Sequence, residues 1–528
     1  MAKAQRNARR CQQGRPGCGL FHPIPKRWPL LLAPVSFLCS AAWAAEWDIN
    51  PAVSIRETYS DNISLVPDGS KQSEWVTQII PGVSVSATGA RLKFNAGYGP
   101  ELNYYARGQY ENQILQRGNA RGTAELAQEL LYVDFGATVD QYDVSLQAPL
   151  TSNNANTTGN RSTVGSYFVS PYLLRDFGSD VRAEARFTGS VVDSDDETSL
   201  ADSLASRIDL RLKSGDAYKL LTWDIEYGGE TIDYKNRQDG IVSEVVTANA
   251  RRLINPGVGL LAQAGHETYR TGDVAPKSGG GSWSAGLEWT PSPRTRVRTT
   301  AGHRFYGDTY AFEFSHRSRL TTWGAGYNED VTTTRSEFLV PSGTTTAGYL
   351  DTLFTSQYPD PVARKNAVDE FIARTGLPPN LGDAVNFFNS QLFLVKRWQA
   401  SAGILGIRNV LIANVFRETR NTLVGNIILP GAGDFAAGSD VDQNGAGFQW
   451  NLRLTPRDAW NLGAEYSRNA FSGTGRTDKV LYVGMGLTRQ FQPRLSGSLN
   501  YRRQQKDSNE STSSYTENAL FANLTMRF

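Results

Sequence analysis

The segment Trp75–Ala87 reads WVTQIIPGVSVSA, and one row of alternate positions in it is mostly apolar: Trp75, Thr77, Ile79, Pro81, Val83, Val85 and Ala87. Successive side chains of a β-strand point to opposite faces, so this pattern predicts a strand with one apolar face. Strands of soluble proteins are usually about five or six residues long. The longer alternation seen here suits a strand of about 9–11 residues that crosses a bilayer at a tilt.

The same alternation recurs along the chain, for example in Trp47–Tyr59 and Leu92–Tyr104, and its connections are of two kinds. Some are short turns, such as Thr88–Ala90, Asn255–Gly257 and Gln492–Arg494, and others are long polar loops, such as Asp61–Ser73, Arg107–Gly118, Ser145–Ser162 and Thr419–Val441. Short turns at one end and long loops at the other are typical of outer-membrane barrels, and lipid forces such a sheet to close. The sequence therefore predicts an all-β fold, a transmembrane antiparallel β-barrel of about 22 strands (about 18–22), with one long, partly helical loop insertion.

Composition excludes several other classes of protein. The 528 residues carry a formal net charge of +2, but the first 44 contain basic residues and no acidic ones, so the remainder is slightly acidic. An acidic body argues against a nucleic-acid partner. Mean hydropathy is −0.40, which excludes a multi-helix membrane protein. Cysteine occurs only at Cys11, Cys18 and Cys39, which removes disulfide scaffolds, Cys-ligated zinc and thiol catalysis from the rest of the chain.

Both ends of the chain carry export features. Trp28–Leu38 is a short apolar stretch preceded by Lys26 and Arg27 and followed by Ala42-Trp43-Ala44. This arrangement predicts a signal peptide over 1–44 and a barrel over 45–528 that reaches the outer membrane of a Gram-negative bacterium, in contact with its lipid and lipopolysaccharide. The final strand alternates through Leu524 and Met526 to Phe528 and resembles the signal that the barrel assembly machinery reads.

One stretch, 332–389, departs from the alternation and is predicted to be a long loop insertion with short helices. Asp360 suits a helix N-cap, Pro361 suits the first helical position, and Val362–Thr375 has an apolar side. A loop with its own structure is often functional. It could plug the barrel, serve a partner at its mouth, or be a structured surface loop. The candidate plug or lid residues are Asp360, Val368, Phe371, Ile372, Phe387 and Phe388.

No catalytic motif is present in the sequence. After residue 44 the only histidines are His266, His303 and His316, and neither HExxH nor GxSxG occurs. The acidic run from Asp193 to Glu197 could bind Ca²⁺, but a solvated loop is the simpler interpretation. Several arginines could line the lumen and tune its selectivity: Arg294, Arg296, Arg298, Arg502 and Arg503. We therefore expect no enzyme, no cofactor and no metal site; an outer-membrane hydrolase is the least favoured alternative.

Two segments, Glu57–Ala106 and Gly382–Asn409, resemble an outer-membrane family associated with PEP-CTERM systems. The first segment matches the family at the end of a strand, at a lysine in the following loop, along a strand that contains Pro-Gly, and at an arginine in the next turn. The matching residues are Glu57, Thr58, Tyr59, Asp61, Asn62, Lys71, Val76, Thr77, Ile79, Pro81, Gly82 and Arg91. The remainder of the mature chain resembles the family loosely. Members of that family are encoded near exosortase and exopolysaccharide genes. The resemblance therefore implies a role in export or assembly of an exopolysaccharide, as a gated channel or a scaffold. The implied partners are that polymer or its export proteins. The alternative is a general diffusion porin without a polysaccharide partner.

Overall fold

The structure is a computed structural model that describes residues 45–195, 202–235, 240–272, 278–339, 350–351, 353–354, 364, 367–368, 371, 391–423 and 440–528. Its strands are β1 (Glu46–Ser60), β2 (Glu74–Thr88), β3 (Leu92–Tyr98), β4 (Glu101–Tyr105), β5 (Gln113–Leu115), β6 (Gly118–Ala127), β7 (Leu131–Asp143), β8 (Arg161–Phe177), β9 (Val181–Ser194), β10 (Ser203–Ser214), β11 (Leu221–Tyr234), β12 (Ile241–Asn255), β13 (Val258–Thr271), β14 (Ser278–Ser292), β15 (Thr295–Arg304), β16 (Gly307–Arg317), β17 (Thr321–Thr333), β18 (Leu392–Leu405), β19 (Asn409–Thr422), β20 (Val441–Arg453), β21 (Asp458–Phe471), β22 (Arg476–Gln492), β23 (Leu495–Ser508) and β24 (Tyr515–Arg527). The helical elements of the described part include η1 (Asp68–Ser70), α2 (Thr334–Leu339) and η2 (Ser511–Ser513).

The strands form one antiparallel sheet that closes on itself, because β1 pairs with β2 on one side and with β24 on the other. β3 and β4 together form one membrane-spanning strand of the barrel, and β5 and β6 together form another. The 24 strand segments therefore make a barrel of 22 strands. The strand formed by β3 and β4 is interrupted at Pro100, which has no backbone N–H to donate to a neighbour. The predicted closed barrel of about 22 strands is confirmed. The predicted loop Arg107–Gly118 is wrong in part, because β5 lies inside it and pairs with β4.

The outer face of the barrel is apolar, and the alternation seen in the sequence sorts side chains between this face and the lumen. Aliphatic and aromatic side chains are exposed around the whole wall, among them Ile49, Tyr104, Leu210, Leu260, Trp289, Trp323, Leu487 and Leu499. In water such a surface would be unstable, but it matches the hydrocarbon of a membrane. None of the helices in the described part combines the length and the apolarity needed to cross a membrane.

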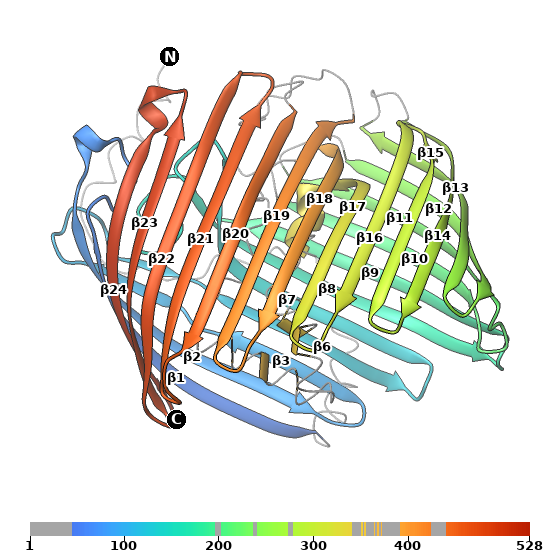
Figure 1. Cartoon of the computed structure of the whole chain (residues 1–528), viewed down its shortest axis with the longest axis horizontal. Helices are drawn as coiled ribbons and strands as arrows, with labels where there is room; N and C mark the ends of the chain where they lie inside the picture. The colour runs from blue at the N-terminus through green and yellow to red at the C-terminus, as the bar shows by residue number, and fades with distance from the viewer. Residues whose placement is uncertain are drawn as a thin grey trace, which may run out of the picture.

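The two rims of the barrel differ in the connections that they carry. Short turns and the C-terminus lie at the lower rim in Figure 1, whereas the long connections lie at the upper rim. Outer-membrane barrels keep short turns on the periplasmic side, so the upper rim is the extracellular one. At the lower rim Leu524 pairs with Ile55 and Met526 with Val53 across the closing seam. Leu524, Met526 and Phe528 all point outward and are about half exposed.

The insertion leaves the wall between β17 and β18. Thr332 and Thr333 still pair with Phe393 and Leu392, so the wall continues slightly past the predicted start at 332. The chain then forms α2. Farther along, the described residues Leu350, Asp351, Leu353, Phe354, Arg364, Ala367, Val368 and Phe371 are helical.

Candidate functional site in the barrel lumen

The connection between β7 and β8, residues 144–160, turns inward across the extracellular mouth, and we call it the mouth loop. Its Leu146 and Leu150 are buried against inward-facing side chains of β18, β20 and β21: Phe393, Val395, Val441 and Phe471. Removing these apolar groups from water favours the inward position by about 25 cal/mol per Å² buried. The mouth loop therefore lies over the lumen instead of projecting into solvent.

A buried lysine fixes the first part of the mouth loop. The Lys506 ammonium on β23 donates hydrogen bonds to the carbonyl oxygens of Gln147 (3.1 Å) and Ala148 (2.8 Å), and it pairs with Asp478 on β22 at 3.0 Å. Arg476 also pairs with Asp478 at 3.0 Å and donates to the Gln147 carbonyl. The Lys506 and Asp478 side chains are fully buried, so each charge depends on these partners.

A second buried ion pair holds the far part of the mouth loop. Glu517 on β24 pairs with Arg502 on β23 at 2.7 Å, and both side chains are buried. The same carboxylate accepts hydrogen bonds from Asn156 in the mouth loop (2.8 Å) and from the Ser60 hydroxyl (2.7 Å). Because charged hydrogen bonds are stronger than neutral ones, this group ties the loop to the closing seam of the barrel.

Neutral contacts complete the attachment between these two ion pairs. Gln504 donates from its amide to the Leu150 carbonyl (2.8 Å) and accepts from the Ser152 hydroxyl (2.6 Å). Tyr515 donates to the same Leu150 carbonyl at 3.2 Å. On the β4 side, Tyr105 donates to the Ala155 carbonyl at 3.2 Å. The mouth loop is thus fastened to β23 and β24 and, across the closing seam, to β4.

The insertion also turns inward at its start. The Arg335 side chain of α2 is fully buried. It contacts β9 and β10, which are not neighbours of β17 in the sheet. Its guanidinium donates to the Ser203 hydroxyl of β10 at 2.8 Å and to the Ser190 hydroxyl of β9 at 2.8 Å. The segment after β17 therefore reaches across the lumen to the opposite wall.

Below the mouth loop lies a cavity of about 800 Å³, with Leu150, Thr151 and Ser152 at its top. Amides and hydroxyls dominate its β20–β24 side, and we call this side the amide wall: Gln449, Asn451, Asn461, Thr488, Asn500 and Asn523. Glycines at inward positions leave the space open. Gln449 lies over Gly463, and Asn500 lies over Gly486 so closely that a Cβ on that glycine would displace it.

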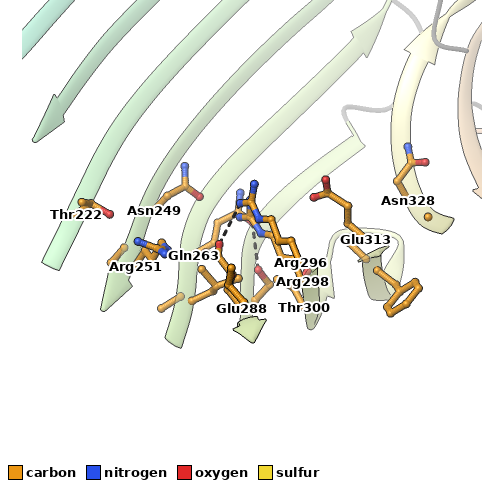
Figure 2. A pocket seen from close by; sticks show the side chains of 18 of the residues that line it. Thr222, Asn249, Arg251, Gln263, Glu288, Arg296, Arg298, Thr300, Glu313 and Asn328 are labelled. Atoms are coloured by element: carbon orange, nitrogen blue, oxygen red, sulfur yellow. Dashed lines mark hydrogen bonds and ion pairs between the residues drawn. The ribbon is translucent and has the colours of Figure 1, made fainter. Parts of the chain in front are cut away.

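A larger cavity of about 1100 Å³ lies against β11–β18, and Figure 2 shows the side chains that point into it. Glu288 on β14 pairs with Arg251 on β12 at 2.7 Å and with Arg296 on β15 at 3.1 Å. Arg298 and Glu313 point into the same space, and neither makes an ion pair or hydrogen bond within the described part of the chain.

Similar charges continue along the neighbouring strands, where Arg211 pairs with Glu226 at 2.7 Å and Arg207 with Asp209 at 2.8 Å. The whole set forms the charged wall: Glu184, Arg186, Arg207, Asp209, Arg211, Glu226, Arg251, Glu288, Arg296, Arg298 and Glu313. Most of these side chains remain partly exposed to the lumen, so water competes with each pair.

Two of the six predicted plug residues, Val368 and Phe371, lie in the described part of the insertion. Val368 and Phe371 are buried with Leu350, Leu353 and Phe354 in a cluster that also contains Leu405, Val410 and Ile412. The last three residues flank the short turn between β18 and β19, at the lower rim. Asp360, Ile372, Phe387 and Phe388 lie outside the described residues.

The other predicted side chains are spread around the barrel. His303 contacts Asp308 at 3.0 Å where both are exposed, and His316 contacts the Thr295 hydroxyl at 2.9 Å. Asp195 accepts a hydrogen bond from Ser162 at 2.6 Å. In the described residues no three His, Cys, Asp or Glu side chains are grouped to hold a metal ion. Of the predicted lumen arginines, Arg502 is buried in an ion pair, whereas Arg503 is exposed.

Sequence reasoning missed the mouth loop, which it treated as one more polar connection. Two signals were present. Leu146 and Leu150 interrupt a polar stretch, and Arg502 and Lys506 occupy inward positions near the end of a strand. Charged side chains at inward positions near the mouth indicate buried partners, because an isolated buried charge is costly.

Comparisons with known proteins give the following similarities. The model of a family described as "Putative beta-barrel porin 2" matches residues 436–528, which contain β20–β24 and hence the amide wall. No curated protein matches the chain. Among solved structures, the siderophore receptor PirA from Acinetobacter baumannii is 8% identical, with 91% of this chain and 80% of that chain covered and a TM-score of 0.46.

Two further solved structures are from Pseudomonas aeruginosa. The ferric enterobactin receptor PfeA, as a double mutant, is 10% identical, with 91% and 80% of the two chains covered and a TM-score of 0.44. OpdK, determined with vanillate, is 10% identical, with 91% and 99% covered and a TM-score of 0.34. The closed sheet and its apolar outer face identify this chain as an outer-membrane β-barrel of the kind found in Gram-negative bacteria.

Proposed function

We propose that the protein is an outer-membrane channel whose extracellular mouth is covered by a releasable loop, and that it serves export or assembly of an exopolysaccharide. One observation carries this proposal: the mouth loop is fixed across the lumen by buried ion pairs, above a cavity that remains open. A scaffold needs no cavities, and a permanently open porin needs no fastened cover.

The lumen supports the channel part of the proposal. A barrel of this size encloses more space than its own wall side chains fill. Here the remaining space has polar walls on both sides, which suits water and hydrophilic solutes. No catalytic role is part of the proposal.

The way the mouth loop is held supports the idea that it can be released. Burying Lys506, Asp478, Arg502 and Glu517 costs desolvation energy that their mutual attraction largely offsets. When the loop leaves, water hydrates the same groups again, so the closed and open positions can be close in free energy. A cover held by apolar packing alone would lack this compensation.

The polysaccharide part of the proposal rests on the resemblance of Glu57–Ala106 and Gly382–Asn409 to the PEP-CTERM-associated family. We extend it to the insertion, whose Val368 and Phe371 would narrow the lower part of the lumen as a plug. Lipopolysaccharide around the barrel, the assembly machinery acting on Leu524, Met526 and Phe528, and export proteins are the partners that this role requires.

Conductance of single channels in a planar bilayer tests the proposal. Residues 45–528 contain no cysteine, so Ser152→Cys and Gln504→Cys create the only thiols in the refolded mature chain. A short, reducible crosslinker between them would lock the mouth loop where Ser152 and Gln504 now bond. We expect the locked protein to be closed and the reduced protein to open intermittently.

The single Ser152→Cys variant treated with the same reagent is the control. Large, steady conductance before and after reduction would reject the cover and favour a general diffusion porin. Silence in both states would favour a scaffold. A variant lacking Tyr349–Asn389 separates the insertion from the mouth loop, because it should raise conductance only if the insertion also obstructs the lumen.

A further inference from the structure

The smaller cavity has an unusual set of lining groups for an ion pathway. Along β22–β24, between Gln504 and the lower rim, the inward side chains that line it are neutral until Arg527. The other charged lining groups lie around these strands: Glu465 on β21, Asp143 on β7, Arg117 between β5 and β6, and Arg56 on β1. An anion pathway would need arginines or lysines here, and a cation pathway would need carboxylates. The amide wall therefore fits an uncharged, hydrogen-bonding ligand.

The amides that line the cavity keep hydrogen-bonding capacity. Asn500 donates to the Ser498 hydroxyl at 3.0 Å, but its carbonyl oxygen accepts no hydrogen bond within the described residues. Asn523 accepts from the Ser54 hydroxyl at 2.9 Å and donates to Thr525 at 3.2 Å. Each side-chain amide has two N–H groups and two carbonyl lone pairs, so both residues retain free positions.

Aromatic rings lie among these amides on the inward face. Tyr482 on β22 and Phe521 on β24 line the same cavity as Asn500 and Asn523. A pyranose ring presents apolar C–H groups on its faces and hydroxyls around its edge. Aromatic faces beside amides match both parts, because large rings offer apolar area at low entropic cost.

Arg56 on β1 adds one charged donor at the edge of this wall. Its register partner on β24 is Asn523, and its Nε is buried without a hydrogen-bond partner. The guanidinium can donate to a ring or hydroxyl oxygen. It would also accommodate a carboxylate, so the experiment must separate neutral from acidic sugars.

We infer that the amide wall is a binding track for an uncharged saccharide chain, with Asn500, Asn523, Tyr482 and Phe521 as its central contacts. The inference deepens the proposed channel function and rests on it, because a track inside the lumen serves only a solute that passes through. A volume of about 800 Å³ lies within the range of ligand sites, roughly 300–1,000 Å³. The mouth loop forms its roof, so release of the loop would open the track to the exterior.

Calorimetric binding of maltohexaose to the full mature protein in detergent tests this inference without requiring conduction. We expect measurable binding to the unchanged protein and an affinity at least about tenfold lower for Asn500→Leu with Asn523→Leu. The matched control is Asn249→Leu with Asn328→Leu, which makes the same chemical change at the larger cavity and should leave the affinity unchanged. Heat-modifiable gel mobility reports whether each variant is folded, and Phe521→Leu replaces the double variant if that one fails to fold.

Three results would overturn the inference: no binding by the unchanged protein, equal binding by the amide-wall variant, or an equal loss in the control. The same measurement with hexagalacturonate, an acidic sugar chain, tests whether the site prefers a charged ligand. Tighter binding of this acidic sugar that disappears in Arg56→Gln would also reject an uncharged ligand. Potassium chloride conductance of the same preparations separates the two proposals, because binding by a protein that never conducts would retain the track and reject the channel.

Discussion

On the charged wall, most guanidinium and carboxylate groups pair with each other and stay in contact with the lumen, whereas on β22–β24 the paired charges of the lumen gather at the extracellular end. The exposed fractions show the difference. The Arg211 and Glu226 side chains are 51% and 41% exposed, but Lys506 and Asp478 are both 0% exposed. The same residue types thus line a wet surface on one side and fasten a loop on the other.

This difference follows from what covers each group of charges. Lys506 and Glu517 lie beneath the mouth loop, which excludes water and supplies a carbonyl oxygen to the ammonium and an amide N–H to the carboxylate. Glu288 is buried too, yet its partners Arg251 and Arg296 remain 34% and 46% exposed. Removing one partner should therefore be severe under the loop and mild on the charged wall.

The largest effect is expected for Glu517→Ala. It leaves Arg502 buried without its carboxylate and removes the acceptor of Asn156 and Ser60. Breaking a buried pair in this way costs about 3–5 kcal/mol. We expect a lower urea midpoint of unfolding by tryptophan fluorescence and more frequent open events in a bilayer.

Glu226→Ala on the charged wall is the comparison for that variant. Its ion pair with Arg211 is largely exposed, so the change should cost less than about 1 kcal/mol. Equal midpoints for the two variants would show that the mouth loop does not shield its ion pairs.

Most of the wall could be predicted from sequence, because alternation is a local property. Trp75–Ala87 lies within β2, and the outward row of the final strand, from Leu520 to Met526, is exposed as the pattern implies. The break at Pro100 and the strand β5 were missed, since short, interrupted segments carry too few alternations to be distinguished from loops.

The mouth loop could not be predicted in the same way, because its contacts are not local. Ser152 and Gln504 bond across 352 positions of sequence, and Asn156 and Glu517 across 361. Nothing in 144–160 alone says which strands it meets. The insertion at 332–389 was predicted from its lack of alternation, a signal that a shorter connection between two regular strands cannot give.

A middle-sized effect is expected for Glu288→Gln on the charged wall. The change frees Arg251 and Arg296 of their shared carboxylate, so the larger cavity gains positive charge. The open channel should become more selective for anions, measured as a shift of the reversal potential in a potassium chloride gradient. Because both arginines are partly hydrated, stability should fall by only about 1 kcal/mol. An unchanged reversal potential would mean that ions bypass the larger cavity.

The smallest effect is expected for Arg298→Gln, which sharpens the comparison by removing a charge that fastens nothing. Arg298 makes no ion pair in the described residues, so the free energy of unfolding in urea should stay within about 0.5 kcal/mol of that of the unchanged protein. Selectivity should shift toward cations, opposite in sign to Glu288→Gln, since Glu313 then faces the cavity without a neighbouring cation. Glu313→Gln should give the reverse shift at equal stability. If either change destabilised the barrel as much as Glu517→Ala does, the charges of the charged wall would also stabilise the fold. The distinction between them and the buried charges at the extracellular end of β22–β24 would then be wrong.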